Sequence, residues 1–187
     1  MPAVNLCQSV NNHNVSVLKG LAAGTIGGLL ASWVMNEFQY AWTKVANNLS
    51  QSSQNGSNTP EQSKNSEQEP ATIKAAEMIS EKVLGHQLAK EDKEWAGEFV
   101  HYAIGAASGA VYGAAAELVP DVTAGAGIPF GTAFWLVVDE GAVPLLGLSK
   151  PPFDYPLSTH IYAMTSHFVF GVTTEIVRRA VRRGVLS

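Results

Sequence analysis

Residues 17–35 read VLKGLAAGTIGGLLASWVM, an apolar stretch that contains one charged residue, Lys19. About twenty apolar residues in a helix cross the hydrocarbon core of a bilayer, because each residue rises 1.5 Å. The stretch is too long for the apolar core of a cleaved signal peptide, and only Lys19 precedes that core as a positive charge. We therefore predict a retained transmembrane helix that continues to about residue 42.

Three more apolar stretches of similar length follow, and we predict spans at about 95–119, 122–148 and 157–177. Irregular backbone cannot face lipid, so these stretches should be helices. The predicted fold class is an all-α membrane protein, a four-transmembrane-helix bundle. All 187 residues would form this single membrane domain.

The composition agrees with this class and excludes others. Charged residues make up 15% of the chain, whereas a soluble domain usually carries about 25%. The net charge of −4 gives nucleic-acid binding no electrostatic basis. Cys7 is the only cysteine, so neither an internal disulfide nor a thiolate metal cluster can form.

The connection between the first two spans is polar. Residues 47–70 offer almost no apolar side chains to offset ordering entropy, which predicts a flexible outer segment. Residues 72–90 carry a mild apolar stripe that includes Ile73, Ala76 and Ile79. This pattern predicts a short helix that lies at the membrane surface or packs on the spans.

Four arginines directly follow span four: Arg178, Arg179, Arg182 and Arg183. Basic residues beside a span stay on the cytoplasmic side, so the C-terminus should be cytoplasmic. An even number of spans places the N-terminus there too. The same arginines are predicted to contact anionic lipid headgroups, at about 1 kcal/mol each.

Glycines recur at a spacing of four in two predicted spans. They are Gly20, Gly24 and Gly28 in the first span, and Gly105, Gly109 and Gly113 in the second. Glycine lets helix backbones approach closely in lipid, where apolar burial does not drive association. We expect each stripe to pack on a neighbouring helix, either in this chain or in another protein.

Ionisable residues within spans are functional candidates, because they are costly in lipid. Helix direction places one group in the outer half of the membrane: Glu37, Glu98, His101, Asp139, Glu140, His160 and His167. Glu117 and Glu175 approach the inner face.

The leading interpretation of the outer group is an interhelical polar network that fixes packing. The alternatives are a metal site that uses Glu98-x-x-His101, a b-type haem held by His101 and His167, and a route for protons or substrate. No cofactor is predicted in preference to the network. No Ser-His-Asp order or phosphate loop occurs, so we predict no enzyme.

Residues 144–156 read PLLGLSKPPFDYP, and span four ends in Glu175-Ile176-x-Arg178-Arg179. With His101 and His167, these motifs resemble the YagU-like inner-membrane family, whose domain has no assigned activity. The resemblance implies a bacterial inner-membrane protein with a link to acid tolerance. The chain departs from the family at Asp139, where a histidine is expected.

The sequence thus predicts a small multi-pass inner-membrane protein that acts as a structural or accessory subunit. Its predicted partners are membrane lipids and other membrane-protein subunits, or a second copy of itself. The alternative function is a proton- or metal-responsive membrane protein linked to acid tolerance.

Overall fold

The computed structural model describes residues 3–53 and 69–185, and the side-chain surroundings of residues 14–49 and 69–185. The α-helices are α1 (Ala3–Ser53), α2 (Ala71–Ile79), α3 (Lys93–Leu118), α4 (Ile128–Val137), α5 (Val143–Leu145) and α6 (Leu157–Gly184). The short turns of π- or 3₁₀-helix are η2 (Ser80–Leu84), η3 (Pro120–Thr123), η4 (Val138–Ala142) and η5 (Pro152–Asp154). These described residues contain helices and no strand, which confirms the all-α class.

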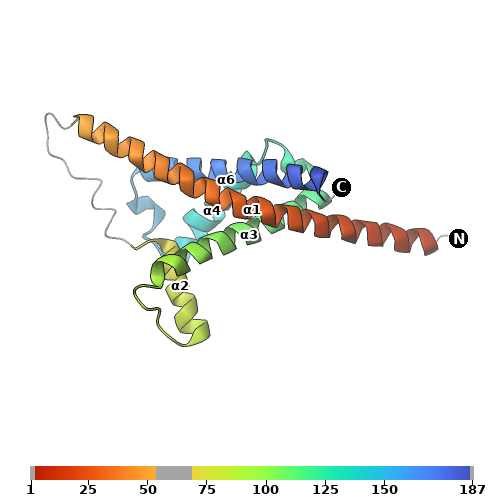
Figure 1. The fold of residues 1–187 in the computed structure, drawn as a ribbon, viewed down its shortest axis with the longest axis horizontal. Helices are drawn as coiled ribbons and strands as arrows, with labels where there is room; N and C mark the ends of the chain where they lie inside the picture. Colours follow the sequence, from red (N-terminus) through yellow and green to blue (C-terminus); the bar gives the residue numbers. More distant parts are fainter. Residues whose placement is uncertain (1–2, 54–68, 186–187) are drawn as a thin grey trace.

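Helix α1 runs the length of the molecule, and α3 and α6 pack against it (Figure 1). Helix α4 packs on α6, and α2 packs on α3. The start of α1 and the end of α6 lie at the same end of the bundle, which we call the terminal end. Helix α2 lies at the opposite end, which we call the α2 end.

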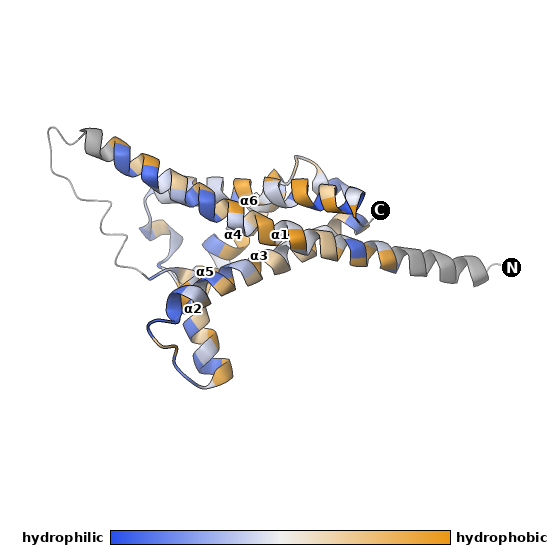
Figure 2. Cartoon of the chain, in the orientation of Figure 1, coloured by the Kyte–Doolittle hydropathy of each residue, from blue (hydrophilic) through white to orange (hydrophobic). Residues whose placement is uncertain are grey.

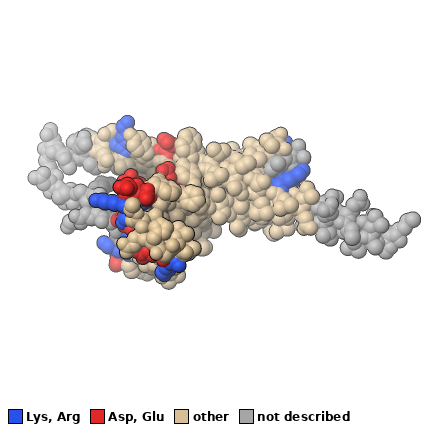
Figure 3. Space-filling view, turned by 60° about the horizontal axis from the view of Figure 1, so that its bottom comes forward, with Lys and Arg blue, Asp and Glu red and all other residues tan. Residues whose placement is uncertain are grey.

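Apolar side chains are widely exposed on this bundle. Figure 2 shows hydrophobic residues along the middle of the helices and a mixture of hydrophilic and hydrophobic residues on α2 and the far part of α1. On the face shown in Figure 3, charged side chains gather toward the two ends and leave a broad uncharged band between them. Trp33, Val111 and Val137 remain 53%, 69% and 68% exposed. Soluble monomers rarely expose large contiguous apolar patches.

One helix in the described part of the chain, over Asn14–Leu49, is long and apolar enough by itself to cross a membrane. It contains the first predicted span. Helical structure continues past the predicted end at 42, so residues 47–53 are helical rather than part of the flexible segment. Residues 54–68, where most of that predicted segment falls, lie outside the described residues.

Helix α3 matches the second predicted span closely, and α6 contains the fourth and extends past it to Gly184. The third predicted span, 122–148, differs. Its helix begins at Ile128, because Gly125, Ala126 and Gly127 have positive φ and form a turn that Pro129 follows at the helix start. The helix then passes through the π-helical turn η4 to Leu145.

The predicted short helix is present as α2 and packs on α3. Ala76 forms a small buried cluster with Ala96 and Val100 of α3. Lys93 pairs with Glu69, at 3.2 Å, and with Glu77 of α2. The hydrogen bonds that Lys93 donates to Glu77 and Glu69 raise its pKa. These contacts attach α2 to the first turns of α3.

Candidate functional site

The two predicted glycine stripes pack against each other within the chain. A Cβ atom on Gly24 would meet the carbonyl oxygen of Gly109, and one on Gly28 would meet that of Gly105, both far inside van der Waals contact. Gly20 approaches the Gly113 carbonyl in the same way. The neighbour that the sequence left undetermined is therefore the other stripe, and α1 and α3 touch backbone to backbone.

A second glycine contact joins α4 to α6. Gly127 and Gly131 both lie against Gly171, so closely that a side chain at any of the three would meet backbone atoms. We did not predict this contact. The spacing of Gly127 and Gly131 is the same four residues as in the stripes, and this was the signal that could have revealed it.

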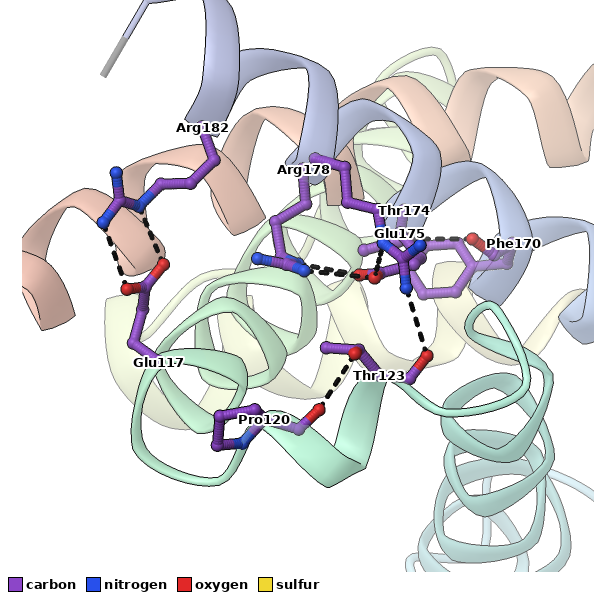
Figure 4. Close-up of polar contacts among 9 residues, drawn as sticks. Glu117, Pro120, Thr123, Phe170, Thr174, Glu175, Arg178 and Arg182 are labelled. Atoms are coloured by element: carbon purple, nitrogen blue, oxygen red, sulfur yellow. Dashed lines mark hydrogen bonds and ion pairs between the residues drawn. The ribbon is translucent and has the colours of Figure 1, made fainter. Parts of the chain in front are cut away.

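An ion pair and hydrogen bonds of Ser16 join three helices at the terminal end, and Figure 4 shows the pair between Glu117 and Arg182. Arg182 of α6 donates to both carboxylate oxygens of Glu117 on α3, at 2.7 and 3.1 Å. Ser16 of α1 donates to the same carboxylate and accepts from Arg182 at 3.2 Å. The predicted inner-face residue Glu117 therefore fastens α1, α3 and α6 together.

Glu175, the other predicted inner-face residue, is fully enclosed at 1% exposure. Arg178 binds its carboxylate in two places, at 2.7 and 3.0 Å, and Arg179 also pairs with it. The Arg178 guanidinium additionally lies 6.0 Å from the centre of the Tyr112 ring. These contacts hold the positively charged guanidinium of Arg178 inside the helix bundle.

The arginines were predicted to contact lipid headgroups, and the structure gives a different role to one of them. Arg178 is only 7% exposed, so its charge is directed to Glu175 and not to the surface. Arg179 and Arg183 are exposed, and Arg182 is partly exposed. Headgroup contact stays a prediction for these three.

The α2 end of the bundle contains a cavity. A cavity of about 1050 Å³ lies among α1, α2, α3, the α4–η4 helix and α6. Its wall is mostly apolar. Four of the seven predicted outer residues line it: Glu98, His101, Asp139 and His167. The structure thus brings ionisable groups from three helices to one space.

His167 and Asp139 lie close to each other in the wall of this cavity. The Nδ1 atom of His167 lies 2.8 Å from the Ala163 carbonyl oxygen, so we assign the proton of the neutral ring to Nδ1. Asp139 Oδ2 lies farther from that atom, at 3.7 Å. The Asp139 side chain is 38% exposed.

Two polar atoms near Asp139 lack a partner. His101 Nε2 and the Ser32 hydroxyl are buried without a hydrogen bond in the described part of the chain, and both residues line the cavity. Ser32 is 0% exposed. A buried polar atom without a partner is destabilising by about 1–3 kcal/mol, so such atoms commonly mark a place for water or a ligand.

The other three predicted outer residues lie outside the cavity wall. His160 Nδ1 lies 2.7 Å from Glu140 Oε1, and its Nε2 lies 3.0 Å from the Pro152 carbonyl oxygen. This pair attaches the start of α6 to η4 and to the proline-rich loop. Glu37 is exposed on α1. The seven predicted outer residues therefore divide into four that line the cavity, the pair of Glu140 and His160, and Glu37, which is exposed.

No group of three or more His, Cys, Asp or Glu residues within the described ranges is arranged to hold a metal ion. The Glu98-x-x-His101 motif lines the cavity as one carboxylate and one imidazole. A haem held by His101 and His167 stays a prediction.

The fold and site define a class: an all-helical protein with one long apolar helix and a cavity whose wall is apolar with a few ionisable groups. The chain belongs to the family described as a protein of unknown function (DUF1440), whose family model matches residues 60–176. The match contains every cavity-lining segment except α1. Neither the curated proteins nor the solved structures include a match to this chain. The resemblance to YagU-like proteins stays a prediction.

Proposed function

We propose that the chain is a multi-pass protein of a bacterial inner membrane, with four crossings made by α1, α3, the α4–η4–α5 helix and α6. Helices α3 and α6, with 26 and 28 residues, are about 39 and 42 Å long at 1.5 Å per residue. Both exceed the roughly 30 Å of bilayer hydrocarbon. The uncharged band and the common position of the two chain ends support this arrangement (Figures 1 and 3). The arginine-rich terminal end would then face the cytoplasm.

We further propose that the protein responds to protons at His101 and His167. The observation that carries this proposal is the unpartnered Nε2 of His101 in the wall of a cavity that also contains Asp139. A proton on His101 would create a charge that interacts with the carboxylates of Asp139 and Glu98. Histidine is the side chain whose charge changes most readily in the physiological pH range, which suits a response to acidification outside the cell.

The response can be measured by the tryptophan fluorescence of the protein in lipid nanodiscs between about pH 5 and 8. We expect one reversible transition in the unmodified protein and its loss in the double variant His101→Gln/His167→Gln. The control is His86→Gln, because His86 is exposed and does not line the cavity. A transition that persists in the double variant, or its absence from the unmodified protein, would contradict the proposal.

The role of a structural or accessory subunit stays a prediction, but its basis changes. The glycine faces, which we expected to pack on a helix of this chain or of another protein, are occupied by contacts within the chain. A partner would therefore have to use the exposed apolar surface of the bundle. Purification in a mild detergent tests this, since a subunit would co-purify with a larger assembly in a fixed ratio.

A further inference from the structure

The charges around the cavity all have one sign. Three carboxylates line it, those of Glu94, Glu98 and Asp139, and no Lys or Arg is among the described lining residues. The nearby Lys93 is engaged by Glu69 and Glu77. His101 and His167 add positive charge only when protonated. When both rings are neutral, the carboxylates make the space electrically negative.

The rest of the wall suits an apolar body. The cavity volume of about 1050 Å³ is at the upper end of the range of small-molecule pockets, roughly 300–1000 Å³. Phe134 and Phe170 stack at 5.3 Å and both line the cavity, and the His167 ring lies 5.5 Å from Phe134. Aromatic faces attract cations as well as apolar groups.

We infer that this cavity binds a lipophilic cation, a compact molecule with an apolar body and one positive charge, and that Asp139 is the residue that holds the charge. Asp139 is the best placed of the three carboxylates. Its only described ion-pair contact within 4 Å is the weak one to His167, whereas Glu94 and Glu98 are exposed at the start of α3. Ser32 and His101, whose hydroxyl and Nε2 are buried without a hydrogen-bond partner among the described residues, belong to the same cavity wall.

This inference names a ligand for the cavity of the proposed function and rests on it for the membrane setting. The two claims use different residues and conditions. The proton response is measured without ligand and depends on His101 and His167. Cation binding is measured at a fixed pH of about 8, where histidine is neutral, and depends on Asp139.

The test is equilibrium binding of radiolabelled tetraphenylphosphonium to the full chain in phosphatidylcholine nanodiscs, with protein-free nanodiscs as the background. We expect saturable binding that Asp139→Asn weakens about tenfold or more. The matched control is Glu140→Gln, which removes a carboxylate one residue away that does not line the cavity. Tetraphenylborate has the same shape and the opposite charge, and it should show no saturable binding.

A second variant tests the cavity without changing its charge. Ala142 lines the cavity, so Ala142→Leu should occupy part of its volume and also weaken tetraphenylphosphonium binding. Equal affinity in the unmodified protein, Asp139→Asn and Ala142→Leu would overturn the inference. So would saturable binding of tetraphenylborate as strong as that of the cation. If Asp139→Asn does not fold, the Ala142→Leu result and the comparison of the two ions decide the question.

Discussion

The two ends of the bundle are built from the same helices and packed in opposite ways. At the terminal end, the glycine backbones of α1 and α3 touch, and Glu117 of α3 pairs with Arg182 of α6. At the α2 end, the same two helices border a cavity of about 1050 Å³. The change occurs where the stripes end, at Gly28 and Gly105, beside the buried Ser32.

This difference suggests that α1 and α3 stabilise the fold at the terminal end and contribute to a binding cavity at the α2 end. Glycine contacts and ion pairs need exact neighbours, so substitutions at the terminal end should destabilise the fold. The cavity at the α2 end has space for additional atoms. Substitutions in its wall should therefore leave the fold intact and change what the cavity binds or how it responds to pH. The predictions below test this contrast.

The largest effect is expected for Glu175→Gln. Breaking a buried ion pair from one side leaves Arg178 without a full counter-charge, which typically destabilises a protein by about 3–5 kcal/mol. Thermal unfolding in detergent, followed by fluorescence, measures the loss. The control is Glu37→Gln, because Glu37 is exposed on α1. Equal stability of the two variants would show that the Glu175 pairs are dispensable.

The next effect is expected for Gly109→Leu. A side chain there would meet the backbone of Gly24 and Gly28, so α1 and α3 would have to separate. Overpacking of this kind destabilises by about 1–3 kcal/mol, and sometimes more. Gly184→Leu is the matched control, because no atom lies within 4 Å of a Cβ at that position. A Gly109→Leu protein as stable as the control would contradict the close packing of the stripes.

A smaller effect is expected for Glu117→Gln, about 1.5 kcal/mol, because its partners are partly exposed. A double-mutant cycle with Arg182→Gln isolates the pair from other contacts of each residue. We expect the double variant to be clearly more stable than the sum of the two single losses predicts. Simple additivity would mean that Glu117 and Arg182 do not interact.

The smallest effect on stability is expected for Ala142→Leu at the α2 end. The added atoms enter the cavity, so the free energy of unfolding should change by no more than about 0.5 kcal/mol. The same unfolding measurement applies. A loss as large as that of Gly109→Leu would show that the cavity end is packed as tightly as the terminal end, and the contrast would fail.

The sequence predicted the helical class, because apolar length and glycine spacing are local signals. It placed seven ionisable residues in one outer group, of which Glu98, His101, Asp139 and His167 line the cavity. It could not predict that Glu140 and His160 pair with each other instead, because two adjacent acids on a π-helical turn point to different sides. The burial of Arg178 was missed for a related reason: a basic cluster after a span predicts charge at a surface, but not which residue turns inward to Glu175.

The most direct test of the account is the side of the membrane on which each end of the bundle lies. A membrane-impermeant maleimide can label the native Cys7, and, in a Cys7→Ser background, Lys150→Cys or Arg183→Cys, in vesicles of known orientation. We expect Cys7 and position 183 to be labelled from the cytoplasmic side, and position 150 from the opposite side only. Labelling of Cys7 and position 183 from opposite sides, or of all three positions from one side, would contradict a four-helix crossing.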